Sequence, residues 1–209
     1  CFKIYENKKM IIKFFIPLII SILVITPTLL NNYSKFDEII LTKSFGYNLW
    51  RGNSEKLNIN GSNFAMDNKF INDFLDSGTD IKRFEIYLDD FFYKKAKKNI
   101  LENPMIYLEH YLNKFFAFSI FNYSSNYPNY YNPFIFIPEI IISIFALGGI
   151  VLNITRRKNI ELLIIIVYYL LLIPIFFVLP RYKLFILPLY FVFASDFYFY
   201  LRSIFSKKQ

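Results

Sequence analysis

Four long apolar segments constrain this chain more than any other feature of its sequence. A helix needs about 20 predominantly apolar residues to cover the hydrocarbon core of a bilayer. Each such segment must be helical in lipid, because unpaired backbone groups there are costly. The composition agrees, since 55% of the 209 residues are hydrophobic and the mean hydropathy is +0.34. The sequence therefore predicts four transmembrane helices, over residues 10–30, 133–154, 161–179 and 184–201.

The basic residues indicate which way these helices face. Residues 31–133 carry 12 basic and 12 acidic side chains, so the whole net charge of +8 lies elsewhere. Ten of the other 12 basic residues gather at three places, which four spans would bring to one side of the membrane. The positive-inside rule makes that side cytoplasmic and places both termini on it. The three clusters are Lys3, Lys8, Lys9 and Lys13, then Arg156, Arg157 and Lys158, then Arg202, Lys207 and Lys208.

This topology sets the organisation of the whole chain. We expect an N-terminal cytoplasmic stub, a large outer loop region, a cytoplasmic loop, a short outer turn and a cytoplasmic tail. Topology also accounts for the basic charge, so we expect no nucleic-acid partner. The chain begins with Cys1, and we expect it to be the C-terminal portion of a longer protein. The parts outside the spans cover residues 1–9, 31–132, 155–160, 180–183 and 202–209.

A fifth apolar segment, residues 105–121, is predicted to lie in the outer membrane interface. Its polar and apolar residues fall on opposite faces at helical spacing, which favours a helix lying in the interface. A span here would also move the Arg156 cluster to the outer side, against the positive-inside rule. The predicted fold class is all-α integral membrane, with a helical outer loop region. The polar face consists of Glu109, His110, Asn113 and Lys114, and the apolar face of Leu108, Leu112, Phe115 and Phe116.

The outer loop region is too long to lack both structure and function. Apolar residues at helical spacing predict a helix over residues 70–75, before Gly78, and a second from Phe84 to Asn103, before a proline. Residues 44–62 are rich in Gly, Asn and Ser, which is typical of a structured loop. Aromatic side chains here either stack on a sugar or pack without a ligand. The candidate substrate contacts are Tyr47, Trp50, Gly52 and Asn53.

Two basic residues break the positive-inside rule. Arg181 and Lys183 lie in the short outer turn between the third and fourth spans. One interpretation is a pair of side chains that snorkel at a helix end. The other is a binding site for a lipid phosphate, because the planar guanidinium group can hold two phosphate oxygens at once. Tyr182, between them, offers an amphipathic ring at headgroup depth.

Several site types are excluded by residue counts. Cys1 and His110 are the only cysteine and histidine, so no metal cluster and no Ser-His-Asp triad is expected, and we expect no cofactor. An acidic residue within a span is a functional candidate by default. For Asp196, at the cytoplasmic end of the fourth span, a structural role is favoured. Glu139 and Glu161 are weaker candidates near span ends.

Two stretches of the chain resemble a known family. The loop GYNLWRGNSEKLNINGS resembles the pattern GxNLxxGNxPxAxG of GT-C membrane glycosyltransferases of the dolichyl-phosphate-mannose–protein mannosyltransferase-like type. The end LPRYKLFILPLYFVFAS resembles the outer turn PRYRxPxxP that leads into the last helix of that family. The order between them also fits, with Asn103-Pro104 followed by a helix that contains Lys114. Glu55 departs from the usual proline, and Lys183 from the common arginine.

The resemblance implies a transferase that moves a sugar from a polyprenyl-phosphate donor to a lipid, glycan or protein acceptor. Arg181, Tyr182 and Lys183 would bind the lipid phosphate, and the catalytic acidic residues would lie upstream of this chain. The expected location is the bacterial plasma membrane, with membrane lipids as further partners; the oligomeric state stays open. The alternatives are a non-enzymatic membrane protein, such as part of a transporter or a lipid-binding scaffold, and a polysaccharide polymerase or ligase.

Overall fold

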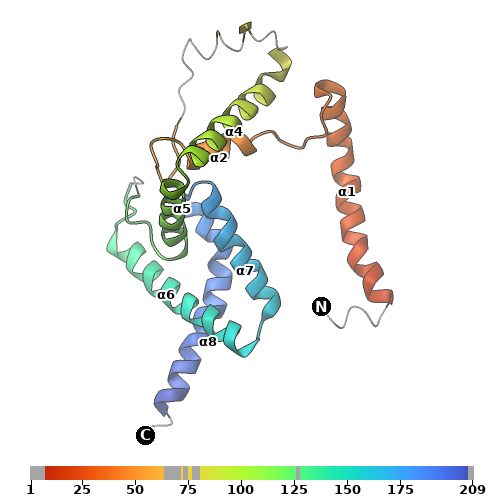
Figure 1. Ribbon diagram of the computed structural model, residues 1–209. Helices are drawn as coiled ribbons and strands as arrows, with labels where there is room; N and C mark the ends of the chain where they lie inside the picture. Colours follow the sequence, from red (N-terminus) through yellow and green to blue (C-terminus); the bar gives the residue numbers. More distant parts are fainter. Residues whose placement is uncertain (1–7, 64–71, 73–74, 77–80, 126–127, 207–209) are drawn as a thin grey trace. The chain divides into compact units, whose positions relative to one another are not determined.

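The computed structural model describes residues 8–63, 72, 75–76, 81–125 and 128–206, and all regular secondary structure in this part of the chain is helical (Figure 1). The expected helix over residues 70–75 lies almost wholly outside the described residues. The chain forms two compact units, residues 1–44 with 66–89 and residues 45–65 with 90–209. The α-helices are α1 (Lys8–Phe36), α2 (Phe45–Gly52), α4 (Phe84–Glu102), α5 (Pro104–Ser119), α6 (Pro133–Arg156), α7 (Ile160–Leu172) and α8 (Lys183–Ser206).

The first unit contains α1, whose apolar part matches the first predicted span. Residues Phe15–Phe36 form a helix of 22 residues in which none of the apolar window is buried. Large side chains such as Val24, 71% exposed, point away from any protein neighbour. A helix that is apolar all round needs an apolar surrounding, which a bilayer supplies. Beyond the helix, Glu38 pairs with Lys43 at 3.2 Å and with Arg83 at 3.1 Å.

In the second unit, α6 and α8 cross at close range. A Cβ atom at Gly149 would lie only 1.9 Å from the backbone oxygen of Phe193, so no other residue fits there without a shift. Small residues let membrane helices approach closely in this way. The core around the crossing is apolar and includes Phe118, Ala146, Ile150, Ile166 and Ile186.

The third predicted span is a shorter helix than expected. Helix α7 has 13 residues, which reach about 20 Å at 1.5 Å per residue, short of the core of about 30 Å. Pro174, which has no N–H to donate, lies in the 3-10 turn Ile173–Ile175 that follows, and residues 176–179 are not helical. Among the residues that the structure describes, three helices are long and apolar enough to cross a membrane: Phe15–Phe36, Pro133–Arg156 and Pro180–Ser206. The protein is therefore membrane-associated, and a fourth span stays a prediction.

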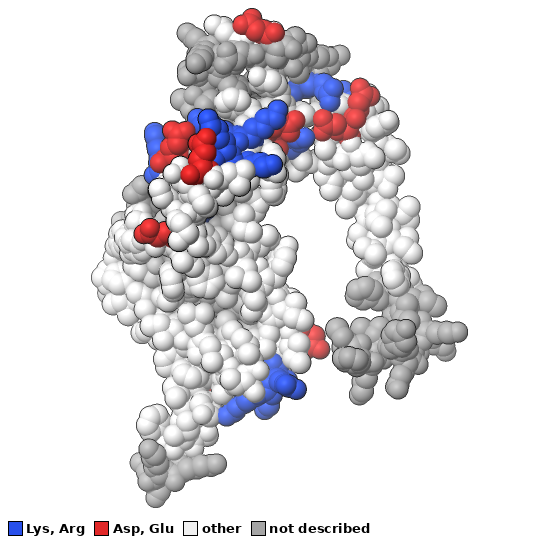
Figure 2. All heavy atoms as spheres, in the orientation of Figure 1, with Lys and Arg blue, Asp and Glu red and all other residues white. Residues whose placement is uncertain are grey.

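Charge separates the two ends of the spans in the second unit. Figure 2 shows basic side chains gathered where α6 leads into α7, with a largely uncharged surface between them and the charged side chains of α4. Asp196 lies near the basic end, where its carboxylate accepts hydrogen bonds from Asn153 at 2.9 Å and Asn159 at 3.3 Å. These two amides tie α8 to the turn between α6 and α7, which is a structural role.

Helices α4 and α5 match the predicted helices of the loop region closely. Helix α5 covers Pro104–Ser119 and begins with a proline, whose missing N–H costs nothing in the first turn. Its apolar residues Leu108, Leu112 and Phe116 are about half exposed, and its interfacial position stays a prediction. The polar face of α5 is not fully exposed, because His110 and Lys114 are buried against the protein.

Candidate functional site

The loop of residues 44–62 folds into helix α2 followed by a series of tight turns. Tyr47 and Trp50 project from α2 onto Phe92 of α4, with ring centroids 5.1 and 4.6 Å from that ring. Trp50 is only 6% exposed. Of the two interpretations of these aromatic residues, the packing of protein rings against one another is therefore the one observed.

Helix α2 ends at a glycine because the segment after α7 passes directly over it. A Cβ atom at Gly52 would lie 1.8 Å from the backbone oxygen of Phe176. The next residue, Asn53, donates hydrogen bonds to the carbonyls of Leu49 and Ile175, both at 2.8 Å. Gly52 and Asn53 are both buried. Each therefore joins the loop to the segment near Phe176.

Lys114 of α5 lies at the centre of this junction. Its ammonium group donates to the Gly52 carbonyl at 2.9 Å, the Asn53 side-chain oxygen at 3.1 Å and the Phe176 carbonyl at 2.7 Å. The residue is 0% exposed, and among the described residues no carboxylate pairs with it. Burial lowers the pKa of the Lys114 amine to about 7. Three acceptors match the three N–H groups of an ammonium ion, and a neutral amine would leave one of them without a donor.

His110, one turn before Lys114, shares the same carbonyl. Its Nε2 lies 3.1 Å from the oxygen of Gly52. A carbonyl oxygen only accepts hydrogen bonds, so Nε2 carries the proton and Nδ1 keeps its lone pair. Burial, and then the charge of Lys114, lower the pKa of His110 to about 4, so the imidazole is neutral at physiological pH.

A cavity of about 560 Å³ opens beside His110. One wall is a single face of α5, formed by Ile106, Glu109, His110 and Asn113 at positions i, i+3, i+4 and i+7. The opposite wall is the turn of residues 56–59, and residues 123–124 complete the lining. The polar face of α5 that the sequence indicates is thus shared between this cavity and the Lys114 junction.

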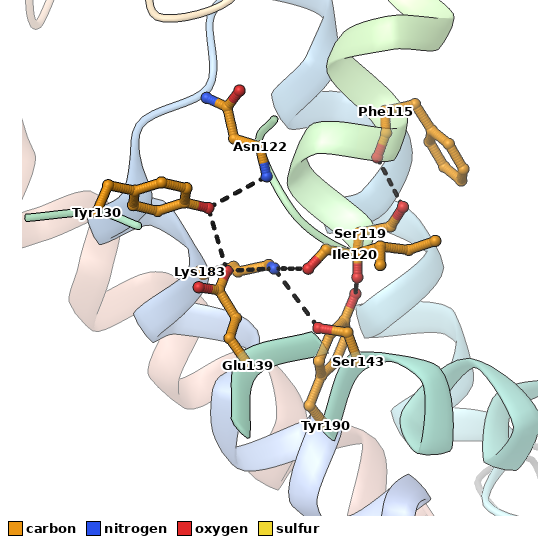
Figure 3. Close-up of polar contacts among 9 residues, drawn as sticks. All are labelled: Phe115, Ser119, Ile120, Asn122, Tyr130, Glu139, Ser143, Lys183 and Tyr190. Carbon is orange, nitrogen blue, oxygen red and sulfur yellow. Dashed lines mark hydrogen bonds and ion pairs between the residues drawn. The ribbon is translucent and has the colours of Figure 1, made fainter. Parts of the chain in front are cut away.

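The turn that precedes α8 separates the two basic residues expected to act together. Arg181 is exposed, and its guanidinium lies 5.7 Å from the ring centroid of Tyr182. Lys183 instead points into the protein, where its amine meets the Glu139 carboxylate at 2.6 Å and the Ile120 carbonyl (Figure 3). Ser143, one turn after Glu139 on α6, lies 3.5 Å away. Lys183 therefore joins α5, α6 and α8, and only Arg181 remains open to a ligand.

Further polar groups surround the pair of Lys183 and Glu139. The Tyr130 hydroxyl accepts a hydrogen bond from the Asn122 backbone at 3.1 Å and lies 3.5 Å from Glu139 (Figure 3). Burial raises the pKa of Tyr130 to about 12, so the phenol stays protonated. On the other side of the cluster, Tyr190 donates to the Ser119 carbonyl at 2.7 Å. The cluster is tightly bonded, as a structural element is.

The sequence contains a signal for the pair of Lys183 and Glu139. Glu139 and Lys183 have opposite charges at the same predicted end of two spans, and opposite charges in an apolar surrounding pair with each other. The burial of His110 and Lys114 had no such signal, since a polar helix face is ordinarily exposed to water.

Within the second unit, the arrangement described above combines the bonded clusters of Lys114 and Lys183 with the exposed Arg181 and the polar cavity beside His110. The exposed arginine can bind an anion, and the cavity can bind a polar ligand with both donors and acceptors. Among the described residues, no group of three or more potential ligands is placed to hold a metal ion. No protein-family model matches the chain, and neither does any curated protein or any solved structure.

Proposed function

We propose that this chain is the C-terminal part of a membrane glycosyltransferase that moves a sugar from a polyprenyl-phosphate donor to a lipid, glycan or protein acceptor. The proposal starts from the resemblance of residues 46–62 and 179–195 to GT-C glycosyltransferases. The acceptor hydroxyl would attack the anomeric carbon of the sugar. The bond between that carbon and the phosphate oxygen would break, the acceptor proton would pass to an acidic base, and polyprenyl phosphate would leave.

One observation carries the proposal: the first segment that bears the resemblance is bonded to the residues directly before the second. Lys114 bonds the Gly52 carbonyl of the first segment and the Phe176 carbonyl, just before the second, at 2.9 and 2.7 Å. The Val178 amide donates to the Ile59 carbonyl at 2.8 Å. Residues more than a hundred positions apart thus form one bonded unit, at the end of α6 and α8 away from the Arg156 cluster.

Within this unit we assign the donor phosphate to Arg181, with Tyr182 beside it. The guanidinium is exposed, and in the described part of the chain no carboxylate forms an ion pair with it. Lys183 is bonded to Glu139 and would hold the turn in place instead of touching the phosphate. The guanidinium would offer two parallel N–H groups to the phosphate and stabilise the charge that develops on it as the sugar leaves.

The experiment that tests this function is donor-dependent sugar transfer by the full-length protein with Arg181 replaced. A charge-assisted contact contributes about 1.5–3 kcal/mol, so Arg181→Ala should lower transfer about 10- to 100-fold. Arg181→Lys keeps the charge but not the planar fork, and should lose less. Arg202→Ala, at the other end of α8, is the matched control and should transfer normally. Unchanged transfer by Arg181→Ala, at normal protein level in the membrane, would remove the assignment.

The proposed orientation has its own test. In intact cells, an impermeant thiol reagent should label a cysteine at Asn63, which is exposed, and should not label one at Arg157. Asn60 is unsuitable for this test, because it is buried and bonded to Asn122 at 2.8 Å. Labelling at Arg157 alone would invert the orientation and place residues 44–62 and Arg181 on the cytoplasmic side.

A further inference from the structure

Three of the polar side chains that line the cavity beside α5 are not used by the described part of the protein. Glu109 and Asn113 project from α5, and Lys56 from the opposite turn. Within the described residues, none of these three forms a hydrogen bond or ion pair with another side chain or with the backbone. The neighbouring polar residues Asn53, Lys114 and Asn122 are all fully engaged. The polar groups of Lys56, Glu109 and Asn113 are therefore available to a ligand in the cavity.

His110 adds a buried group to the same wall. It is 5% exposed and its Nε2–H is donated to Gly52. Its Nδ1 has no hydrogen-bond partner in the described part of the chain, and the carbonyl of Gly52 fixes the tautomer in which that atom is an acceptor. The tautomer does not change with pH near neutrality, because burial keeps the pKa of His110 near 4. His110 thus offers a fixed acceptor for a hydroxyl group.

The charge of the lining selects among ligands. Lys56 and Glu109 contribute one positive and one negative charge, which cancel. A phosphate or diphosphate needs a surplus of cationic donors, as a cluster of arginines or lysines provides. A ligand with many hydroxyl groups is different, since each hydroxyl both donates and accepts. It can therefore use the carboxylate, the amide, the ammonium and the imidazole together.

The apolar part of the lining fits the same ligand. Ile59, Ile106 and Tyr123 line the cavity between the polar groups. Sugar rings have apolar C–H faces beside their hydroxyl edges, so they match a wall of mixed character. The volume of about 560 Å³ lies inside the range of about 300–1,000 Å³ that is typical of small-ligand sites.

We infer that this cavity is a binding site for an uncharged carbohydrate, held by Glu109, His110 and Asn113 on α5 and by Lys56 on the facing turn. The binding of a carbohydrate is inferred from the chemistry of the cavity alone. The role of that carbohydrate, as the acceptor glycan or as the sugar of the donor, rests on the proposed function.

The test is direct binding by the full-length protein in nanodiscs, measured by saturation-transfer NMR. The probes are three neutral disaccharides, mannobiose, chitobiose and maltose, with inorganic pyrophosphate as a charged comparator. At least one disaccharide should give a signal, and Glu109→Ala and Asn113→Ala should each reduce it at least fivefold. Glu102→Ala, an exposed glutamate on α4, is the matched control and should leave the signal unchanged. Pyrophosphate should not displace the disaccharide.

Three results would overturn the inference. These are the absence of a signal from every neutral disaccharide, an undiminished signal in both α5 variants, and displacement by pyrophosphate. Failure of the inference is distinguishable from failure of the proposed function. Disaccharide binding without donor-dependent transfer would support the carbohydrate site and contradict the proposed function. Transfer without disaccharide binding would support the proposed function and contradict the carbohydrate site. In active protein, Glu109→Ala should raise the KM of the acceptor if the acceptor binds here, and that of the donor if the donor's sugar does.

Discussion

Two lysines in the second unit are held in opposite ways. Lys114 is completely buried and bonded to three neutral oxygens, whereas Lys183 is bonded to the carboxylate of Glu139. The first lysine keeps an uncompensated charge and binds protons weakly, with a pKa lowered to about 7. The second shares its site with an opposite charge. The difference shows that a lysine can join helices either as a hydrogen-bond donor to backbone oxygens or as half of an ion pair, with different sensitivities to substitution and pH.

The largest expected effect is at the ion pair. Glu139→Gln keeps the shape of the side chain but leaves the charge of Lys183 without a counter-charge. Breaking a buried pair from one side costs about 3–5 kcal/mol, and we expect a loss of that size in the free energy of unfolding, measured by steric trapping in bicelles. The double variant Glu139→Leu with Lys183→Met should recover most of the loss. If the single variant were as stable as the parent, the pair would contribute nothing to the fold.

The second effect concerns the close approach of Gly52 to the Phe176 backbone, next to Lys114. Gly52→Ala places a Cβ atom 1.8 Å from the Phe176 oxygen in the present structure, so the segment around Phe176 must move. Overpacking of this kind costs about 1–3 kcal/mol, and the segment should also lose its bond to Lys114. Thermal unfolding in micelles measures the loss, and Gly148→Ala is a milder comparison, because its Cβ would meet only the Phe197 ring, at 2.8 Å. Equal stability of Gly52→Ala and the parent would contradict the backbone contact.

The third effect is the removal of the Lys114 charge itself. Lys114→Met takes away the donor of three oxygens, and each buried acceptor left unsatisfied costs about 1–3 kcal/mol. The variant also removes a buried charge without a counter-charge, which offsets part of that cost. We therefore expect a net loss of about 1–2 kcal/mol, smaller than at Glu139. Lys98→Met, an exposed lysine on α4, is the control and should change stability little. A loss above that of Glu139→Gln would reverse the comparison.

The smallest effect is a pH dependence confined to the Lys114 site. The pKa of Lys114 is about 7 in the folded protein, against 10.5 as its ordinary value. Between these values the unfolded state binds more protons, so the contribution of this group to stability rises with pH. The stability of the parent relative to Lys114→Met should increase by about 1 kcal/mol between pH 7 and pH 8. The same unfolding measurement at the two pH values tests this. A difference that does not change with pH would mean that Lys114 stays charged throughout.

The candidate site could be predicted from the sequence only in part. The loop of residues 44–62 was expected to be structured, and it is. Its members Gly52 and Asn53 were expected to touch a substrate, but they lie buried at the junction with Lys114. Lys183 was expected beside a phosphate, but it bonds Glu139. In each case a partner more than 40 residues away decides the role of the side chain, and no local pattern shows that partner.

The sequence by itself determined the helices. The apolar segments, the prolines at their starts and the helical spacing in α4 and α5 are local features, and helix formation responds to such features because its hydrogen bonds join residues four apart. The tertiary structure alone decided which polar side chains are buried together. Helix α7 ends at Leu172 and not at residue 179, the predicted end of the third span. The reason is that the chain beyond Pro174 forms hydrogen bonds with Lys114 and with Ile59 instead. The tertiary structure also turned one face of α5 inward, because the carbonyls of Gly52 and Phe176 needed donors that only a distant residue could supply.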